Sequence, residues 1–267
     1  MMKNIAFAGA LCLLAGTAQA ADGILIVQQT TVGSGAPQTH RTRIDAKRMR
    51  AETTGSNVVV FDGIKQLMML IDETRKTYTE ITKADADALG AQMSGMMAQM
   101  QQQMQSMPPE QRAQMEAMMK GRGGAAMRGM GVAKTQYRKA GTGTVGKWTC
   151  DKYEGYQGEK KVSELCTVDP KVLGFTEADF AVAKEMAAFF KQIMPGGAAE
   201  MLSLGSTELG FSGMPVKTVS SSGSQTITTE VTEVSRQSIP DSAFHAPTGY
   251  QKTDMTELMS GRGRGGE

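Results

Sequence analysis

The sequence predicts an α+β protein that combines an antiparallel β-sheet with packed helices and a methionine- and glutamine-rich helical insert. Short apolar runs separated by turn residues fill residues 23–81, as is typical of an antiparallel meander. Eleven of the 22 methionines lie between Met93 and Met130. Apolar residues recur at helical spacing from Thr176 to Met194, which indicates an amphipathic helix packed against the sheet.

The first β block reads as six short strands joined by polar turns. The strands are predicted over 24–32, 39–44, 48–53, 58–61, 66–71 and 77–81. The fourth strand runs into Asp62-Gly63, which is a strong hairpin signal. Asp45, Asp62 and Asp72 fall at strand turns, where aspartate favours the local backbone geometry. We therefore assign these carboxylates to turns rather than to acid–base catalysis.

The second β block contains the two cysteines outside the first twenty residues. Strands are predicted over 134–138, 143–156 and 160–168, with a final hairpin over 214–219 and 225–235. Cys150 and Cys166 are symmetric about Gly158, so a hairpin would place them opposite each other at the Cα separation of about 5 Å that suits a disulfide. Such a disulfide stabilises a fold by roughly 3 kcal/mol. Without a Cys-x-x-Cys motif or nearby histidines, a structural role is favoured.

The first twenty residues have the pattern of a secretory signal peptide. Lys3 supplies the positive start, an apolar run follows over 5–16, and Ala18-Gln19-Ala20 is the small-residue site before cleavage. Cys12 follows Leu11, so the small residue of a lipoprotein site is missing. We expect cleavage after Ala20, a periplasmic protein without a lipid anchor, and no transmembrane segment in the remainder.

Charge and motif content argue against nucleic-acid binding and against an enzyme. The chain has 29 basic and 27 acidic residues, so its formal net charge of +2 implies no large basic face. Its histidines, His40 and His245, are far apart in unrelated contexts. No nucleophile elbow, phosphate loop or zinc motif occurs. We expect a non-enzymatic protein that needs no cofactor.

The methionine insert over 83–131 carries the candidate site. Pro108-Pro109 ends a first helix, and a second piece is predicted over 109–120, followed by a Gly- and Arg-rich stretch. Six methionines of the first helix fall on one face, and they are the tentative ligand-binding residues: Met93, Met96, Met97, Met100, Met104 and Met107.

Four interpretations of this methionine face remain open. It is the buried face of a helical hairpin, a pliable cover over an apolar ligand, a thioether site for Cu(I) or Ag(I), or a surface for docking on an envelope partner. In the metal alternative the ligands come from adjacent turns of the helix: Met93, Met96, Met97 and Met100.

Short motifs elsewhere resemble known bacterial families. The block over 57–81, with its VVVFDG hairpin and DETRKTYTEI return, resembles exported lipoprotein carriers of the LolA/LolB type. Further motifs resemble the periplasmic domain-of-unknown-function family 4412: Arg48-Met49-Arg50, Gly146-Lys147-Trp148-Thr149-Cys150, Gly213-Met214-Pro215-Val216-Lys217 and the ending IPDSAFHAPTGY.

The resemblance implies a strongly curved antiparallel sheet, a LolA-like half-barrel, with helices in its concave side. We expect a single LolA-like domain over 21–252 that includes the insert, after the signal peptide over 1–20 and before a tail over 253–267 whose composition indicates disorder. The expected function is that of an exported binding protein that holds an acyl chain, lipid or lipopeptide against the sheet, with a lipoprotein or an envelope protein as possible partners.

Overall fold

The computed structural model describes residues 20–53, 55, 58–106, 135–193, 210–222 and 225–255. Three predictions fall on residues outside these ranges and stay predictions. They are the signal peptide up to Gln19, the second part of the insert from Met107 onward, and the tail beyond Met255.

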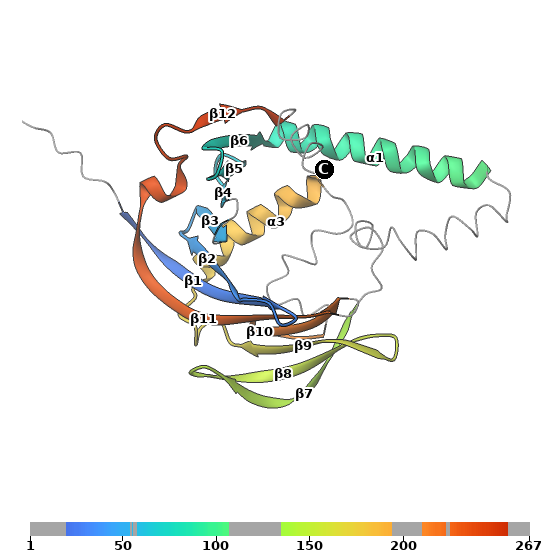
Figure 1. The fold of residues 1–267 in the computed structure, drawn as a ribbon, viewed down its shortest axis with the longest axis vertical. Helices are drawn as coiled ribbons and strands as arrows, with labels where there is room; N and C mark the ends of the chain where they lie inside the picture. Colours follow the sequence, from blue (N-terminus) through green and yellow to red (C-terminus); the bar gives the residue numbers. More distant parts are fainter. Residues whose placement is uncertain are drawn as a thin grey trace, which may run out of the picture.

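The described strands form one twelve-stranded sheet in the order β12-β6-β5-β4-β3-β2-β1-β11-β10-β9-β8-β7 (Figure 1). The strands are β1 (Ala20–Val32), β2 (Gln38–Ile44), β3 (Arg48–Thr53), β4 (Val58–Asp62), β5 (Leu67–Asp72), β6 (Thr77–Thr82), β7 (Gln136–Val145), β8 (Trp148–Gln157), β9 (Lys160–Val168), β10 (Met214–Ser222), β11 (Gln225–Pro240) and β12 (Gln251–Thr253). The described helical segments are α1 (Lys83–Ser106), η1 (Glu177–Phe180), α3 (Ala181–Ile193) and η3 (Asp241–Phe244).

The α+β class and the antiparallel sheet with packed helices are confirmed. Every strand pair is antiparallel except β12 with β6, which run parallel. The sheet is open, with β12 and β7 at its edges. The sheet bends around α3 but does not curl strongly (Figure 1). The strongly curved half-barrel expected from the resemblance therefore stays a prediction.

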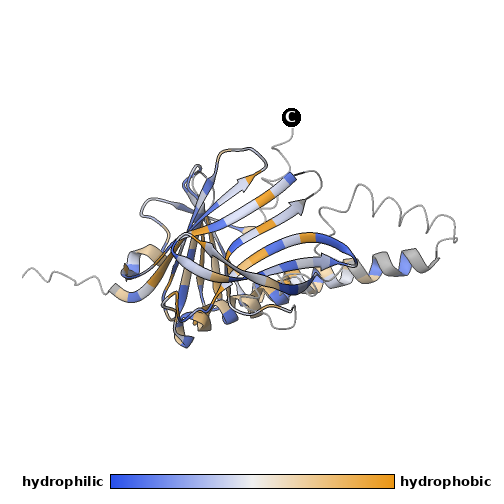
Figure 2. Ribbon diagram, turned by 90° about the horizontal axis from the view of Figure 1, so that it is seen from below, coloured by the Kyte–Doolittle hydropathy of each residue, from blue (hydrophilic) through white to orange (hydrophobic). Residues whose placement is uncertain are grey.

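Both faces of β4 and β5 are buried, which explains their nearly continuous apolar runs. On β4, Phe61 belongs to the core against α3, whereas Val60 belongs to a second core on the opposite face. On β5, Met68 and Met69 divide between the same two cores. Apolar and polar residues alternate along several strands in Figure 2, as the two-residue period of a strand requires.

The core on the first face is closed by α3. This helix presents Val182, Met186 and Phe189 to the sheet, at the i, i+4 and i+7 spacing of one helical face. The Phe189 side chain is 0% exposed, and its ring centroid lies 5.5 Å from that of Phe61 on β4. The amphipathic helix predicted over 176–194 is confirmed, with a turn of 3₁₀ helix, η1, as its beginning.

A buried carboxylate fixes the start of this helix. Asp179 is 6% exposed and accepts hydrogen bonds from the backbone N and Oγ1 of Thr176, at 2.6 and 2.7 Å. It also accepts one from Nη2 of Arg236 on β11, at 2.6 Å. Burial alone would raise the pKa of Asp179, but the Thr176 bonds and the Arg236 charge outweigh it and lower this pKa. The ionised carboxylate therefore ties α3 to the sheet.

The segment after β11 closes the second core. Phe244 of η3 packs with Ile239 and the outward residues of β4 and β5. The guanidinium of Arg48 lies 4.3 Å from the centroid of the Phe244 ring and pairs with Asp45 and Asp241. β12 then pairs with β6 at the edge of the sheet. This C-terminal strap, residues 239–253, is a feature that the sequence patterns did not predict as a structural unit.

The β8–β9 hairpin and its disulfide are confirmed, with one correction. Cys150 and Cys166 are bonded, with their Cα atoms 5.4 Å apart. A register shift between Gly155 and Tyr156 places Lys152 opposite Cys166, so the two cysteines are diagonal rather than directly opposite. The symmetric count about Gly158 was wrong for two reasons. The turn pairs Gln157 with Lys160, which moves the pairing by one residue, and the shift between Gly155 and Tyr156 moves it by another.

The single strand predicted over 143–156 is also wrong. The chain turns at Gly146-Lys147, with Gly146 at φ +53°, and divides this stretch between β7 and β8. Gly146 supplies the left-handed conformation that such a turn requires.

The Asp179 anchor gives a testable prediction. We expect Asp179→Ala to lower the free energy of unfolding by about 1–2 kcal/mol, because the Thr176 bonds and the Arg236 pair are lost. The pKa of Asp179 is lowered by folding, so its contribution should be constant above about pH 5 and should shrink as the pH falls below about 4. Urea unfolding across this pH range measures the difference between the wild type and the variant.

Glu177→Ala, at an exposed carboxylate in the same turn, is the matched control and should change stability by less than about 0.5 kcal/mol. Equal losses in the two variants would contradict the role assigned to Asp179.

Candidate ligand-binding groove and the methionine helix

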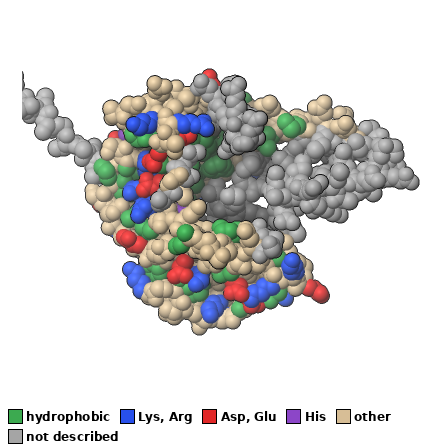
Figure 3. All heavy atoms as spheres, in the orientation of Figure 1, with side chains coloured by type: hydrophobic (Ala, Val, Ile, Leu, Met, Phe, Trp, Pro, Cys, Tyr) green, Lys and Arg blue, Asp and Glu red, His purple; other side chains and the backbone are tan. Residues whose placement is uncertain are grey.

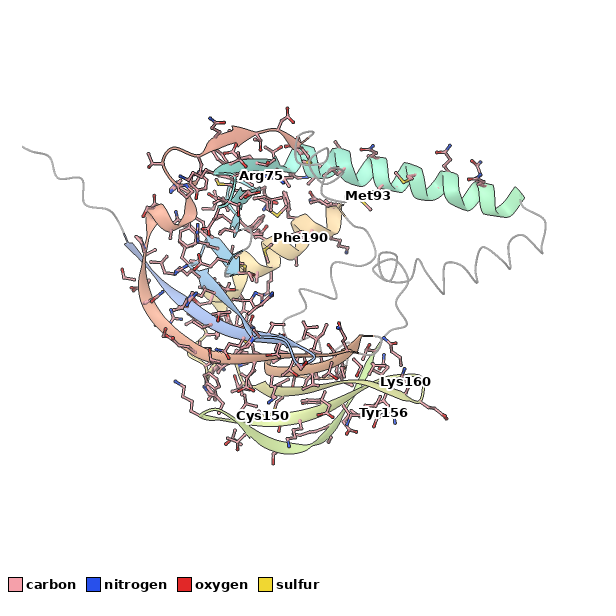
Figure 4. The ribbon with its side chains drawn as sticks, viewed as in Figure 1. Arg75, Met93, Cys150, Tyr156, Lys160 and Phe190 are labelled. Atoms are coloured by element: carbon pink, nitrogen blue, oxygen red, sulfur yellow. A yellow bond between two sulfur atoms is a disulfide. The ribbon has the colours of Figure 1, made fainter. Side chains whose placement is uncertain are left out.

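A groove of about 390 Å³ lies over strands β7–β10. Its lining residues on β8, Lys152 to Glu154, lie between Cys150 and Tyr156, which are labelled in Figure 4. Its walls combine apolar and charged side chains: Ala140, Thr144, Val145, Lys152, Tyr153, Glu154, Glu164, Leu165, Cys166, Lys217 and Val219. Apolar side chains such as Val145 and Val219 lie beside charged ones in this lining, a combination that suits a small amphipathic molecule.

Most charges at the rim are already paired. Lys217 Nζ lies 2.9 Å from Glu230 Oε2. Lys161 Nζ lies 2.5 Å from Glu154 and 2.7 Å from Glu164. The hydrogen bond from Lys161 lowers the pKa of Glu154, and its two carboxylate partners raise the pKa of Lys161. Acidic and basic side chains are intermixed over this part of the surface in Figure 3, so the groove lies in no field of a single sign.

Lys152 differs from the other lining charges. Among the described residues it has no ion-pair partner, although it lines the groove beside the disulfide residue Cys166. Its side chain crosses Gly143 on β7, where an added Cβ would lie 2.2 Å from Lys152 Cε. The absence of a side chain at Gly143 thus makes room for the lysine. The groove therefore offers an ammonium group to a ligand that carries an anionic or acceptor group.

The groove is continuous with the core beneath α3. Val145 and Cys166 belong both to the groove lining and to the buried cluster that contains Phe189. Trp148, the single tryptophan of the chain, is also in this cluster and is 6% exposed. The disulfide thus holds β8 and β9 together at the point where the groove meets the core.

The methionine helix lies elsewhere. α1 contacts β6 and α3, at the other end of the strand order from β7–β10 (Figure 1). Ala86 is buried, and an added Cβ at Gly90 would lie 2.0 Å from the carbonyl oxygen of Gln192 on α3. Beyond this close approach α1 extends away from the sheet, past the position of Phe190 on α3 (Figure 4).

Five of the six tentative ligand-binding methionines lie on this helix, as the sequence predicted, and Met107 lies outside the described residues. Met93 is half-buried next to the crossing with α3, and Met96 is 64% exposed. The side chains of Met97, Met100 and Met104, together with Met107 as a whole, lie outside what the structure describes. The predicted ligand and metal roles of this set therefore stay predictions.

The other residues considered from sequence are separated from the groove. Nδ1 of His40 is 2.7 Å from Thr53 Oγ1, and Nδ1 of His245 is 3.0 Å from the carbonyl oxygen of Asp241. Neither histidine lines the groove.

The three turn aspartates behave as predicted. Oδ1 of Asp45, Asp62 and Asp72 each accepts two backbone N–H groups from the following turn, at 2.6 to 3.0 Å. Their carboxylates are thus engaged in local turn structure.

Neither a membrane-spanning helix nor a metal cluster of His, Cys, Asp or Glu occurs within the described residues. No helix within the described ranges is long and apolar enough to cross a membrane. No group of three or more His, Cys, Asp or Glu side chains in the same ranges is arranged to hold a metal ion. The latter finding does not bear on thioether ligands.

The fold defines a class of protein, an open antiparallel sheet with one face covered by a helix, and its disulfide is consistent with an extracytoplasmic location, since disulfides persist in oxidising compartments. Residues 73–250 match the family described as Domain of unknown function (DUF4412), and the chain belongs to this family. This confirms the family resemblance stated from the sequence motifs. No curated protein matches the chain.

Solved structures show weak likenesses. An uncharacterized conserved protein from Thermus thermophilus is 10% identical with a TM-score of 0.41, over 88% of this chain and 90% of that chain. PNGF-II is 11% identical with a TM-score of 0.37, over 91% of this chain and 32% of that one. A LolA superfamily protein from Nitrosomonas europaea is 7% identical with a TM-score of 0.27, over 86% of this chain and 91% of that one. None of these likenesses bears on function at such scores.

The close approach of α1 and α3 gives a second prediction. We expect Gly90→Ala to destabilise the protein or to displace α1, because the new Cβ would collide with the Gln192 carbonyl. Gly95→Ala is the matched control in the same helix, where nothing lies within 4 Å of an added Cβ, and it should stabilise by about 0.5–1 kcal/mol. Thermal unfolding of both variants measures the contrast. Stabilisation by both substitutions would show that α1 does not pack on α3 at this point.

Proposed function

We propose that this protein is an exported, non-enzymatic binding protein of the cell envelope that holds an amphipathic ligand such as a fatty acid, lipid or lipopeptide. The groove over β7–β10 is the observation that carries this proposal, because its apolar lining residues suit an acyl chain and its rim offers Lys152, which has no ion-pair partner among the described residues, to an anionic group. In this proposal the groove lies in the concave side of a LolA-like half-barrel, and the periplasm, reached by cleavage after Ala20, is the site of action.

The arrangement of the groove supports binding without a reaction. The lining carboxylates Glu154 and Glu164 share Lys161, and Glu154 also accepts a 2.7 Å hydrogen bond from the hydroxyl of Tyr156. Their lone pairs are thereby engaged, and the lowered pKa of Glu154 keeps it ionised, which is unsuited to a general acid. A ligand in the groove would meet fixed charges and apolar surface.

A titration with a long-chain fatty acid tests the proposal. Trp148 belongs to the cluster that supplies two groove residues, so its fluorescence should change with saturation as the groove fills. Val219→Asp should weaken binding about tenfold or more, since it places a charge against the acyl chain. Ser220→Asp, on the neighbouring position of β10 and outside the lining, should leave the affinity unchanged.

Native mass spectrometry of the protein purified from its own cell envelope is the second measurement. A consistent absence of bound lipid, together with no response to the fatty acid, would sink the proposal. So would equal effects of the two aspartate substitutions.

Lys152 gives a separate prediction on the charge of the ligand. We expect Lys152→Ala to weaken binding of the fatty acid roughly fivefold, the effect of an exposed ion pair, and to leave the affinity for the matching long-chain alcohol unchanged. The same titration measures both ligands. Lys160→Ala, at an exposed lysine outside the lining, is the control, and an equal loss for acid and alcohol would contradict the role of Lys152.

A further inference from the structure

The buried seam of α1 continues into the part of the helix that leaves the body. Ala86 and Gly90 pack against α3 and the sheet. Steps of alternately three and four residues carry the same stripe onward to positions 93, 97, 100 and 104, all of them methionine. At 100° per residue these six positions fall within an arc of about 80°. This is the a/d spacing of a coiled coil, so the seam is a helix-packing surface.

The seam is longer than the helix it packs against. α3 ends at Ile193 in the described chain, immediately after the Gln192 carbonyl that faces Gly90. From Gly90 to Ser106 the helix continues for about 24 Å at 1.5 Å per residue. A lone helix of this length is marginal in water, and tertiary contacts normally supply most of its stability. Within the described residues, the methionine positions therefore continue the seam past the end of α3.

The charge pattern selects the kind of partner. No charged residue occurs in α1 after Asp87, and Ser94 and Met96, the positions on either side of the seam, are uncharged as well. Helices that lie on anionic membranes carry lysine or arginine on the polar face, which this segment lacks. A partner recognised through ion pairs would find no charge to meet. If the seam packs against the same seam of a second copy, no charge is buried on either side of the contact. Methionine side chains are flexible, so the two surfaces can adapt to each other.

We propose that the outer half of α1 pairs with α1 of a second copy of this chain, as an antiparallel two-helix coiled coil. Antiparallel pairing places the two sheets at opposite ends of the helix pair, where they do not collide, and a two-fold axis generates it from one self-complementary surface. The surface is separate from the groove over β7–β10, so the dimer leaves the groove open. This inference does not depend on the proposed ligand.

Sedimentation velocity of the full chain over a range of concentrations tests the dimer. The wild type should show a reversible monomer–dimer equilibrium. Met97→Glu with Met100→Glu should weaken association by at least about 100-fold, because four like charges would meet in the paired seam. Ala98→Glu with Gln102→Glu adds the same charge on the opposite face, at two exposed positions, and should leave association unchanged.

A conservative pair separates packing from metal binding by thioethers. Met97→Leu with Met100→Leu keeps volume and apolarity, so the dimer should persist in the presence of a metal chelator. Three results would overturn the proposal: a wild-type monomer at every concentration, equal loss in both glutamate pairs, or a monomer that binds phosphatidylglycerol vesicles through the seam. The fatty-acid titration remains a separate readout, and its failure would leave the dimer intact.

Discussion

The packing of α3 across the sheet is the constraint on which the other features depend. Phe189 is completely buried against Phe61, and Val182 and Met186 fill the same layer. Without this helix, apolar side chains of the sheet such as Phe61 would face water, at a cost of about 25 cal/mol per Å² of exposed apolar surface. The helix is held at its beginning by the Asp179–Arg236 pair and meets α1 at its end. The beginning of α3 is therefore tied to β11, and its end contacts α1.

The opposite face of the sheet is closed by the C-terminal strap, and one arginine joins the strap to the first strands. Arg48 holds Asp45, which is 3% exposed, and also reaches Asp241 and the Phe244 ring. Burial of Arg48 opposes its charged form, but the hydrogen bonds to Asp241 and Asp45 outweigh this effect and raise its pKa. The charge of Arg48 thus links a turn in the first β block to a helix and a ring near the other end of the described chain.

Local features of the fold could be predicted from the sequence because local physics determines them. The turn aspartates bond to the next backbone N–H groups, and alternating apolar runs form strands wherever they pair. The pairing of β1 with β11 and of β12 with β6 could not be predicted in the same way, since each joins segments far apart in the chain. The bulge at Gly155 was missed because no residue pattern marks which strand gains the extra residue.

The candidate site was predictable only in part, for a related reason. Helical spacing places the methionines on one face, but whether that face meets the sheet depends on where α1 crosses α3. Gly90 is the decisive residue, because its missing side chain allows the approach to Gln192 and sets the direction of everything after it. Lys152 was missed since a lone lysine on a strand has no signature in sequence. Two features distinguish Lys152: the space that Gly143 leaves for its side chain, and the lack of an ion-pair partner among the described residues. Both depend on the folded structure and not on the local sequence.

The separation of groove and helix argues for a division of labour within one chain. The groove is built on β7–β10 and is fixed by the disulfide, whereas α1 is anchored by β6 and α3 near the other edge. In the two proposals each surface serves its own partner, an amphipathic molecule on the strands held by the disulfide and a second helix on the uncharged methionine seam.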